Sequence, residues 1–342
     1  MSFKNSAVER PIIDSVTPGA AIAGGDFQIR GRSFLSAPRP SVAIGGVAAP
    51  LIVGSNSLVI ARVPEAAGRG EVIVSNGEMD SAPATVAIGM QLADSLHPVA
   101  NPAVDQEGNV YATFSGSRGQ KTPVAVYKVD RDGIITPFLT DLMNATGLAF
   151  DSEGRLLISS RFDGVIYQAT RSGEMSVYVE GMGVATGIAF DGKGNLYVGD
   201  RSGTIFKISP SRQIYVYATL EASISAYHLA FGAEGYLYVT GPTTSSFDAV
   251  HRISPAGEVE AFYRGLGRPQ GMAFDIDENL YVAASIEGRK GIVRITPNRE
   301  ASLFVSGPNI VGCAFAPSGD LIVTTTAALY RVPAGIQGRP LP

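Results

Sequence analysis

The chain has 342 residues, with 40 glycines, 21 prolines, one cysteine and no tryptophan, and 17% of its side chains are charged. An apolar content of 45% excludes an intrinsically disordered chain, and no apolar run approaches the ~18 residues of a membrane span. The net charge of −4 gives no general attraction to nucleic acid, so nucleic acid is not expected as a partner. The single cysteine excludes an intramolecular disulfide framework.

The N-terminal segment, residues 1–10, lacks the apolar stretch of a secretory signal peptide. We therefore expect the protein in the cytoplasm, unless a leader was removed, in which case it is periplasmic or secreted. A lone cysteine is compatible with all of these compartments. The sequence alone leaves the compartment unknown.

Residues 1–90 have the pattern of a small all-β domain. The run PIIDSVTP at residues 11–18 is a short extended segment, and the run from Asp26 to Gly31 alternates, with Phe27 and Ile29 on one face. Further β-strands are expected at residues 41–44, 57–63, 71–75 and 84–88. Short strands separated by turns in this way favour a β-sandwich.

Two runs in this segment, PIIDSVTPGAAIAGGDFQIRGRSF and VAIGGVAAPLIVGSNSLVIARVP, are followed by a closing strand after Asn76 and Gly77. Together they resemble the IPT/TIG family of immunoglobulin-like domains. Members of that family serve as spacers, dimerisation surfaces, polysaccharide-binding neighbours of enzymes or DNA-binding parts of transcription factors. DNA binding requires a basic surface, and the balanced charges of residues 1–90 argue against it.

From residue 97 onward one pattern recurs about every 40 residues. Clear copies are TGLAFDSEGRLLISS from Thr146, TGIAFDGKGNLYVGD from Thr186 and GMAFDIDENLYVAAS from Gly271. The copies align on one apolar position, which holds Val104, Phe150, Phe190, Phe231, Phe274 and Phe315. Most copies continue into a further segment such as TIFKISPSR. A repeat of this length made of short strands is typical of a β-propeller blade.

The apolar run GLAF predicts an inner strand that is buried on both faces. The Asp-x-x-Gly that follows it predicts a tight turn, in which aspartate accepts hydrogen bonds from turn amides and glycine adopts a positive φ. We therefore expect an all-β chain, with an immunoglobulin-like β-sandwich at residues 1–90 followed by a six-bladed β-propeller at residues 91–342. Residues 90–97 are expected to close the last blade, because little sequence remains after it for a fourth strand.

The repeated unit resembles NHL repeats and, more broadly, the six-bladed propellers of the senescence-marker, gluconolactonase and strictosidine-synthase group. The run GNLYVGD at residues 194–200 is the copy most similar to the NHL repeat. This resemblance implies the fold. It does not choose an activity, because such propellers include binding proteins, lactonases, esterases and lyases.

Propeller geometry places candidate ligand-binding residues at one mouth of the central channel, beside the start of each inner strand. The candidates are Thr146, Thr186, His228 and Gln270, with Arg161, Asp200 and Arg201 in the loops above them. Arginine offers a planar fork to carboxylate or phosphate, and threonine hydroxyls bond to polar groups. The alternatives are ordered channel water for the threonines and structural ion pairs or solvated loop ends for the charged residues.

His228 is also the candidate catalytic residue, as a general acid or base, and the catalytic residues are otherwise unknown. The alternative is a packed or hydrogen-bonded histidine beside Tyr227. Cys313 lies within an apolar inner strand, where a thiol is expected to be inert packing.

Lactonases of the group that the repeat resembles bind a divalent metal at this mouth, through the glutamate of an EGP motif and through Asn and Asp side chains. Here the EGP motif aligns with Ala100, Asn101 and Pro102, so the glutamate is replaced by alanine. Hard cations require oxygen ligands, preferably carboxylates. We therefore predict no metal and no cofactor; a divalent metal (Ca, Mg, Mn or Zn) belongs only to the enzyme alternative.

These observations favour a binding or interaction protein that engages a small polar molecule, a glycan or a protein partner through this face of the propeller. One alternative is a divergent gluconolactonase-like hydrolase or lyase that acts at the channel mouth. Another is a structural module that self-associates through the IPT/TIG-like domain.

Overall fold

The computed structural model describes residues 9–35, 39–68, 70–117, 119–244 and 248–340. Residues 1–8 lie outside this set, and they make up most of the segment in which no secretory signal is expected. The chain divides into two compact units, Met1–Met90 with Leu303–Pro308 and Gln91–Ser302 with Asn309–Pro342. The described residues contain β-strands and one short 3₁₀ helix, η1 (Ala233–Gly235). No helix in this part of the chain is long and apolar enough to cross a membrane.

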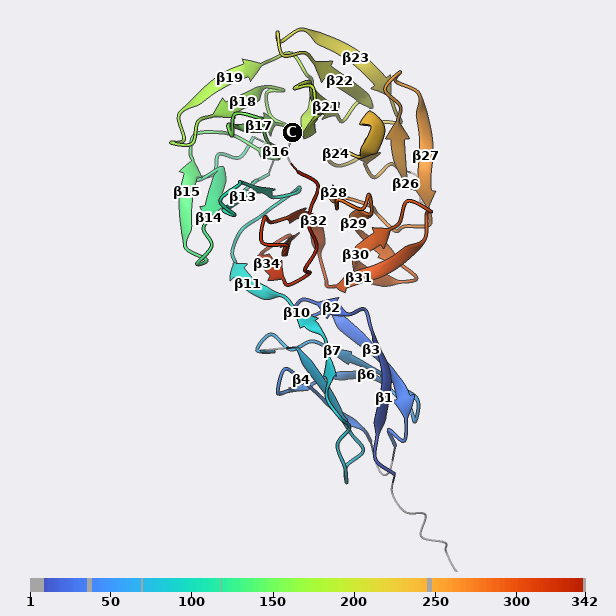
Figure 1. The fold of residues 1–342 in the computed structure, drawn as a ribbon. Helices are drawn as coiled ribbons and strands as arrows, with labels where there is room; N and C mark the ends of the chain where they lie inside the picture. Colours follow the sequence, from blue (N-terminus) through green and yellow to red (C-terminus); the bar gives the residue numbers. More distant parts are fainter. Residues whose placement is uncertain (1–8, 36–38, 69, 118, 245–247, 341–342) are drawn as a thin grey trace, which may run out of the picture. The chain divides into compact units, whose positions relative to one another are not determined.

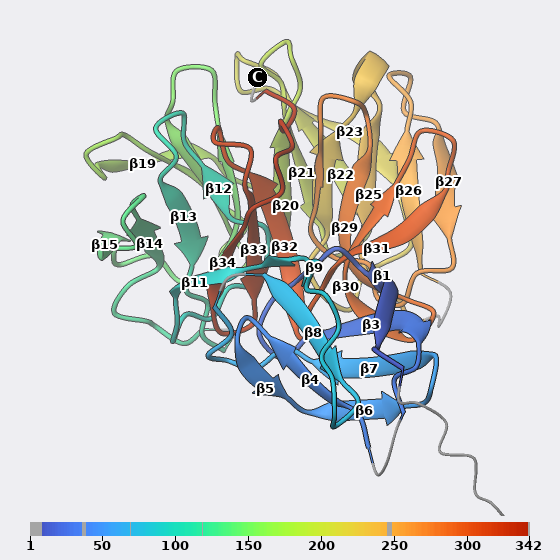
Figure 2. The same ribbon diagram turned by 60° about the horizontal axis from the view of Figure 1, so that its bottom comes forward.

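The first unit is a sandwich of two antiparallel sheets, with strand orders β1-β3-β7-β6 and β5-β4-β8-β9 (Figure 2). The strands are β1 (Ile12–Thr17), β3 (Asp26–Arg32), β4 (Ser41–Ile44), β5 (Val47–Ala49), β6 (Leu51–Gly54), β7 (Leu58–Arg62), β8 (Glu71–Ser75) and β9 (Ala84–Thr85). Phe27 and Ile29 of β3 are buried in one cluster with Val42 of β4 and Val72 of β8. The alternation expected for residues 26–31 is therefore confirmed.

The strand expected at residues 84–88 consists of two short strands with different partners, so the expectation of one strand is wrong. β9 pairs antiparallel with β8, whereas β10 (Ala87–Ile88) pairs in parallel with β2 (Ala20–Ala21). Between them, the N–H of Val86 donates to the carbonyl of Gly70. An apolar run does not indicate where the pairing partner of a strand changes, because both halves of the run have the same β-forming character.

The second unit is a β-propeller, in which sheets follow one another around a central axis (Figure 1). Within the described residues, each of six sheets takes four strands from the repeat. The inner strands are β12 (Ala103–Val104), β16 (Ala145–Phe150), β20 (Ala185–Phe190), β24 (His228–Phe231), β28 (Met272–Phe274) and β32 (Ile310–Phe315). The second strands are β13 (Val110–Thr113), β17 (Leu156–Ser160), β21 (Leu196–Asp200), β25 (Leu237–Thr240), β29 (Leu280–Ile286) and β33 (Leu321–Thr325).

The outer strands of these sheets are more exposed than the inner ones. The third strands are β14 (Val126–Val129), β18 (Ile166–Ala169), β22 (Thr204–Ile208), β26 (Ala249–Ile253), β30 (Arg289–Ile295) and β34 (Leu329–Val332). The outermost strands are β15 (Ile135–Leu139), β19 (Met175–Val179), β23 (Ile214–Thr219), β27 (Val259–Arg264), β31 (Ala301–Ser306) and β11 (Met90–Ala93). β11 lies beside β34 in the sixth sheet.

One aspartate organises the turn between the inner and second strands. In the third sheet, Oδ1 of Asp191 accepts a 2.9 Å hydrogen bond from the N–H of Asn195, and Gly194 has a φ of +79°. Oδ2 of Asp191 accepts from Asn195 Nδ2 at 2.7 Å and from the Tyr197 hydroxyl at 3.3 Å. The turn expected from Asp-x-x-Gly is therefore confirmed in this sheet. The same Asp–Asn–Tyr arrangement recurs around Asp105 and Asp275.

The tyrosine of this arrangement also joins neighbouring sheets. The ring of Tyr197 packs edge-to-face on Tyr217 of its own sheet and on Phe231 of the next, with centroids 4.9 Å apart in both pairs. Such aromatic pairs contribute about 0.5–1.5 kcal/mol beyond the area they bury. The recurring tyrosines therefore belong to the core between blades.

Candidate functional site

The two threonines expected at the channel mouth are buried and hydrogen-bonded to the backbone. The Thr186 hydroxyl donates to the carbonyl of Gly199 at 2.8 Å and accepts from the N–H of Tyr227 at 3.0 Å. The Thr146 hydroxyl donates to the carbonyl of Asn144 at 3.0 Å. Each threonine is only 1% exposed. Both hydroxyls therefore satisfy buried backbone groups near the start of the inner strands.

Asp200 ends β21 and Arg201 follows it, and both side chains bind the backbone. The carboxylate of Asp200 accepts from the N–H of Val184 at 2.5 Å and from that of Ser202 at 2.7 Å, and the residue is 4% exposed. Nη2 of Arg201 donates to the carbonyl of Ile224 at 2.9 Å. These two charged groups fix loops of the third and fourth sheets through hydrogen bonds to the backbone.

Arg161 has the equivalent place after β17. Its Nη2 donates to the carbonyl of Gly116, in the loop that follows β13 of the first sheet, at 2.8 Å. Nδ2 of Asn144 donates to the same carbonyl at 3.1 Å, and Oδ1 of Asn144 accepts from the N–H of Gly119 at 2.8 Å. Asn144 was not among the sequence candidates, although an asparagine just before a repeat, here with a φ of +51°, is a recognisable signal.

His228 differs from the other candidates in position and environment. Counted back from Phe231, it aligns with Gly147 and Gly187, one residue further along the strand than Thr186. It is 3% exposed, and burial lowers the pKa of its imidazole to about 4. The imidazole is therefore neutral at pH 7. A base with this pKa is poorly matched to proton abstraction near neutrality.

Gln270 precedes β28 and is partly buried. Its carbonyl accepts a 2.6 Å hydrogen bond from the Thr240 hydroxyl, and its N–H donates to the carbonyl of Ala283 at 2.8 Å. The seven candidates thus lie in or beside four different sheets. The threonine, aspartate and arginine side chains among them all bind backbone groups.

The described residues do not fit a divalent metal. In this part of the chain, no group of three or more His, Cys, Asp or Glu side chains could hold a metal ion. A hard cation requires several oxygen ligands that converge on one point. We therefore derive no chemistry through a metal.

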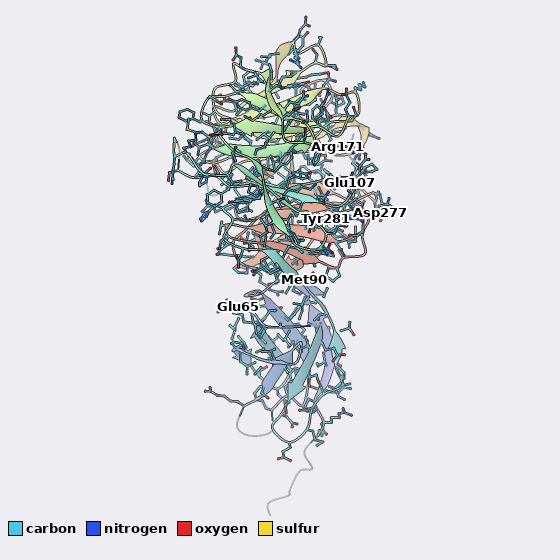
Figure 3. All side chains as sticks on the ribbon, turned by 90° about the vertical axis from the view of Figure 1, so that its left-hand side faces the viewer. Glu65, Met90, Glu107, Arg171, Asp277 and Tyr281 are labelled. Carbon is cyan, nitrogen blue, oxygen red and sulfur yellow. The ribbon has the colours of Figure 1, made fainter. Side chains whose placement is uncertain are left out.

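A cavity of about 1220 Å³ lies in the channel. It begins beyond Thr146 and Thr186 and opens at the opposite end, where each inner strand turns into the second strand. Glu107, Arg171 and Asp277 lie on this face of the propeller (Figure 3). The site predicted from the sequence lies at the other mouth, where the chain enters each inner strand.

The walls that the inner strands contribute to this cavity are mostly apolar. In each copy of the repeat, the residue two positions before the aligned apolar position lines the cavity. These residues are Pro102, Leu148, Ile188, Leu229, Met272 and Cys313. The next position is alanine in every copy, and five of these alanines line the cavity: Ala103, Ala149, Ala189, Ala273 and Ala314. A larger side chain at that level would reduce the space in the channel.

Charged residues border the opening. Lys193, Lys207 and Glu234 line it, and among the described residues none of the three forms an ion pair. Nζ of Lys207 lies 5.7 Å from the centroid of the Tyr197 ring, a cation–π contact. Asp191, in contrast, is engaged by its turn amides, asparagine and tyrosine. The opening therefore offers two ammonium groups and one carboxylate to a ligand.

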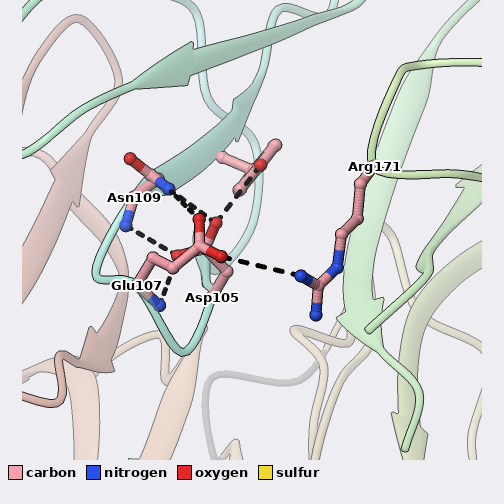
Figure 4. A network of polar contacts seen from close by, with 5 residues as sticks. Asp105, Glu107, Asn109 and Arg171 are labelled. Atoms are coloured by element: carbon pink, nitrogen blue, oxygen red, sulfur yellow. Dashed lines mark hydrogen bonds and ion pairs between the residues drawn. The ribbon is translucent and has the colours of Figure 1, made fainter. Parts of the chain in front are cut away.

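A second cavity, of about 70 Å³, lies between the first and second sheets. Beside it, Asp105 accepts hydrogen bonds from Asn109 and Tyr111, and Arg171 forms a 3.6 Å ion pair with Glu107 (Figure 4). Both members of this pair are about two-thirds exposed, so it contributes little to stability. A space of this size holds roughly two waters. The channel cavity is therefore the better candidate for a ligand site.

Comparison with known families concerns the first unit. A model of the IPT/TIG domain matches residues 11–88. These residues form an IPT/TIG domain. The resemblance seen in the runs at residues 11–34 and 42–64 is thereby confirmed. No curated protein matches the chain.

Solved structures with similar folds have low sequence identity. A gluconolactonase from Xanthomonas campestris is 16% identical, with a TM-score of 0.58 over 75% of this chain and 90% of that chain. Virginiamycin B lyase from Staphylococcus aureus is 20% identical, with a TM-score of 0.52 over 74% and 87%. An auxiliary nutrient binding protein from Bacteroides ovatus is 14% identical, with a TM-score of 0.57 over 95% and 98%. At these identities the likeness shows the fold alone.

Proposed function

We propose that the protein is a binding protein that holds its ligand in the channel cavity of the propeller. The observation that carries this proposal is the cavity of about 1220 Å³, with apolar walls and a charged opening. Ligand sites in proteins are typically concave and mostly apolar, with a few polar groups that orient the ligand. The concave shape, the apolar inner-strand walls and the charged opening of this cavity agree with that pattern.

The walls and the opening indicate the class of ligand. An apolar body is suited to the space between Leu148, Ile188 and Met272, where it replaces water against hydrocarbon. An acidic or hydrogen-bond-accepting end is suited to the opening, where Lys193 and Lys207 lie without an ion-pair partner among the described residues. The proposed ligand is therefore amphipathic.

The structural neighbours are compatible with a binding role. The protein from Bacteroides ovatus, described as an auxiliary nutrient binding protein, matches almost the whole chain. The gluconolactonase and the lyase match the propeller, so a hydrolase or lyase remains the alternative. At the other mouth, the side chains of Thr186, Asp200 and Arg201 are hydrogen-bonded to the backbone, and His228 has a low pKa. Both observations argue against catalysis at that mouth and therefore favour a binding protein.

The binding of an amphipathic ligand in the cavity can be tested with a fluorescent dye. Anilinonaphthalene sulfonate has an apolar body and one anionic group, and its fluorescence rises when it leaves water. We expect one dye molecule to bind per chain. Replacing Ala273→Phe fills part of the cavity and is expected to weaken the binding by about tenfold or more.

The matched control is Ala261→Phe on the outermost strand β27, outside the cavity lining. It introduces the same side chain and is expected to leave dye affinity unchanged. Circular dichroism confirms that each variant is folded. Absence of dye binding by the folded native protein, or equal affinity of the two variants, contradicts the proposal.

Self-association through the TIG domain stays a separate prediction. Sedimentation equilibrium over a hundredfold range of concentration tests it, because a dimer or larger assembly raises the measured mass as concentration rises. A monomer mass throughout would exclude this assembly in that range.

A further inference from the structure

The C-terminal segment, residues 336–340, returns to the channel after the last strand of the propeller. The dark red end of the chain runs inside the ring of sheets (Figure 1). Gly338 forms a β-bridge with Asp275, directly after the inner strand β28. The N–H of Ile276 donates to the carbonyl of Gln337 at 3.1 Å, and the N–H of Arg339 donates to the carbonyl of Phe274 at 2.9 Å. The segment therefore pairs with β28 on its channel side.

Glu278 is an exception within the repeat. The corresponding turn position in the other five copies is glycine with a positive φ, at Gly108, Gly154, Gly194, Gly235 and Gly319. Glu278 has a φ of +62°, a conformation that costs a side-chain-bearing residue free energy relative to glycine. A glutamate that keeps this conformation indicates a role for its carboxylate.

The contacts of that carboxylate show this role. Oε1 of Glu278 accepts a charge-assisted hydrogen bond from Nη1 of Arg339 in the C-terminal segment. Oε2 accepts a 2.7 Å hydrogen bond from the N–H of Ala233 in the neighbouring sheet. Glu278 thus connects the segment to the fourth and fifth sheets of the propeller.

The same segment borders the cavity. Gln337, Gly338, Arg339 and Pro340 belong to its lining, as does Glu278. Two backbone hydrogen bonds and one ion pair hold the segment against the end of β28 and the turn after it, and the N–H of Ile336 donates a third backbone hydrogen bond to the carbonyl of Gly319 at 3.0 Å. The ion pair is about one-third exposed on both sides, so solvent weakens it. So few contacts permit the segment to open locally while the propeller stays folded.

We propose that residues 336–340 form a strap that narrows the cavity opening and controls ligand exchange, with the Glu278–Arg339 pair as its latch. This inference rests on the proposed binding function for its ligand, but the strap itself is defined by backbone pairing. Opening the latch is expected to speed both uptake and release of a ligand.

Two variants open the latch in different ways. Arg339→Gln removes the guanidinium but keeps a long polar side chain. Glu278→Gly introduces the glycine that the other five copies have and relieves the positive φ, so it opens the latch while easing the backbone. Glu153→Gln is the control, because Glu153 lies at a turn tip of the same face, pairs with Arg155 and does not line the cavity.

The first measurement is amide hydrogen exchange, which needs no ligand. Both latch variants are expected to raise exchange about fivefold at the backbone N–H groups of positions 276 and 339, and the control is expected to leave it unchanged. Unchanged protection at these amides in both variants overturns the strap.

The second measurement is stopped-flow binding of anilinonaphthalene sulfonate. Association and dissociation rates are both expected to rise about fivefold in the latch variants. Faster amide exchange with unchanged dye rates overturns the control of ligand exchange and leaves the cavity proposal intact. If the native protein binds no dye, the cavity proposal fails, and amide exchange still decides whether the latch holds the strap.

Discussion

Nδ2 of Asn101 donates a 2.8 Å hydrogen bond to the carbonyl oxygen of Met272. Oδ1 of the same amide accepts a 3.1 Å hydrogen bond from the N–H of Cys313. One asparagine therefore links the first, fifth and sixth sheets where the ring of blades closes. Gly271 and Gly312 make room for it, because a Cβ at either position would collide with Asn101.

Replacing Asn101→Ala is expected to lower the free energy of unfolding by about 2 kcal/mol, since it leaves a backbone carbonyl and a backbone N–H without their partner. Urea unfolding followed by tyrosine fluorescence measures the change. Asn298→Ala is the control, because Asn298 is exposed in a turn, and it is expected to change stability by less than about 0.5 kcal/mol. Equal stability of the two variants contradicts the linking role of Asn101.

The lowered pKa of His228 predicts how the free energy of unfolding depends on pH. Its pKa is about 4 in the folded protein, against an ordinary value of 6.5. The unfolded chain therefore binds a proton first as the pH falls, so stability that is present above about pH 6.5 is lost between pH 6.5 and 4. At pH 5 the loss from this residue is expected to be about 2 kcal/mol.

The measurement compares unfolding free energies at pH 7 and pH 5. In His228→Gln the difference between the two values is expected to shrink by about 2 kcal/mol relative to the native protein. His97→Gln removes an exposed histidine and serves as the control. The same pH dependence in His228→Gln and the native protein would show that His228 is not buried as a neutral group.

Local sequence rules predicted the elements that depend on near neighbours in the chain. The alternation at Phe27 and Ile29 and the turn at Asp191 depend on neighbours within a few residues, and both are confirmed. The change of partner between β9 and β10 was missed, because it depends on a strand far away in the chain.

The site was less predictable for the same physical reason. Arg161 and Arg201 could be recognised as loop cations, but their partners are carbonyl groups that only the folded propeller brings near. The strap was not foreseen at all, since residues 336–340 have no repeat pattern. One signal was present: the run DIDEN has Glu278 where the other copies have glycine.

Arg201 distinguishes a structural role from a ligand-binding role. In Arg201→Gln the carbonyl of Ile224 loses a 2.9 Å hydrogen bond from a charged donor, so stability is expected to fall by about 1 kcal/mol. Affinity for anilinonaphthalene sulfonate is expected to stay the same, because Arg201 does not line the cavity. Thermal unfolding and dye titration of the same variant measure both effects. Unchanged stability would contradict the structural role.

Cys313 is expected to be unreactive in the folded protein, although it lines the channel cavity. The residue is fully buried, its thiol donates to the carbonyl of Tyr281 at 3.7 Å, and burial raises its pKa to about 12. Because the thiolate is the reacting species, only about one thiol in ten thousand is ionised at pH 8. Dithiobisnitrobenzoate is therefore expected to label the native protein no faster than it unfolds, and to label one thiol at once in urea. The reagent is itself an aromatic anion that the cavity could admit, so rapid native labelling would show that Sγ is accessible from the channel and that its burial is incomplete.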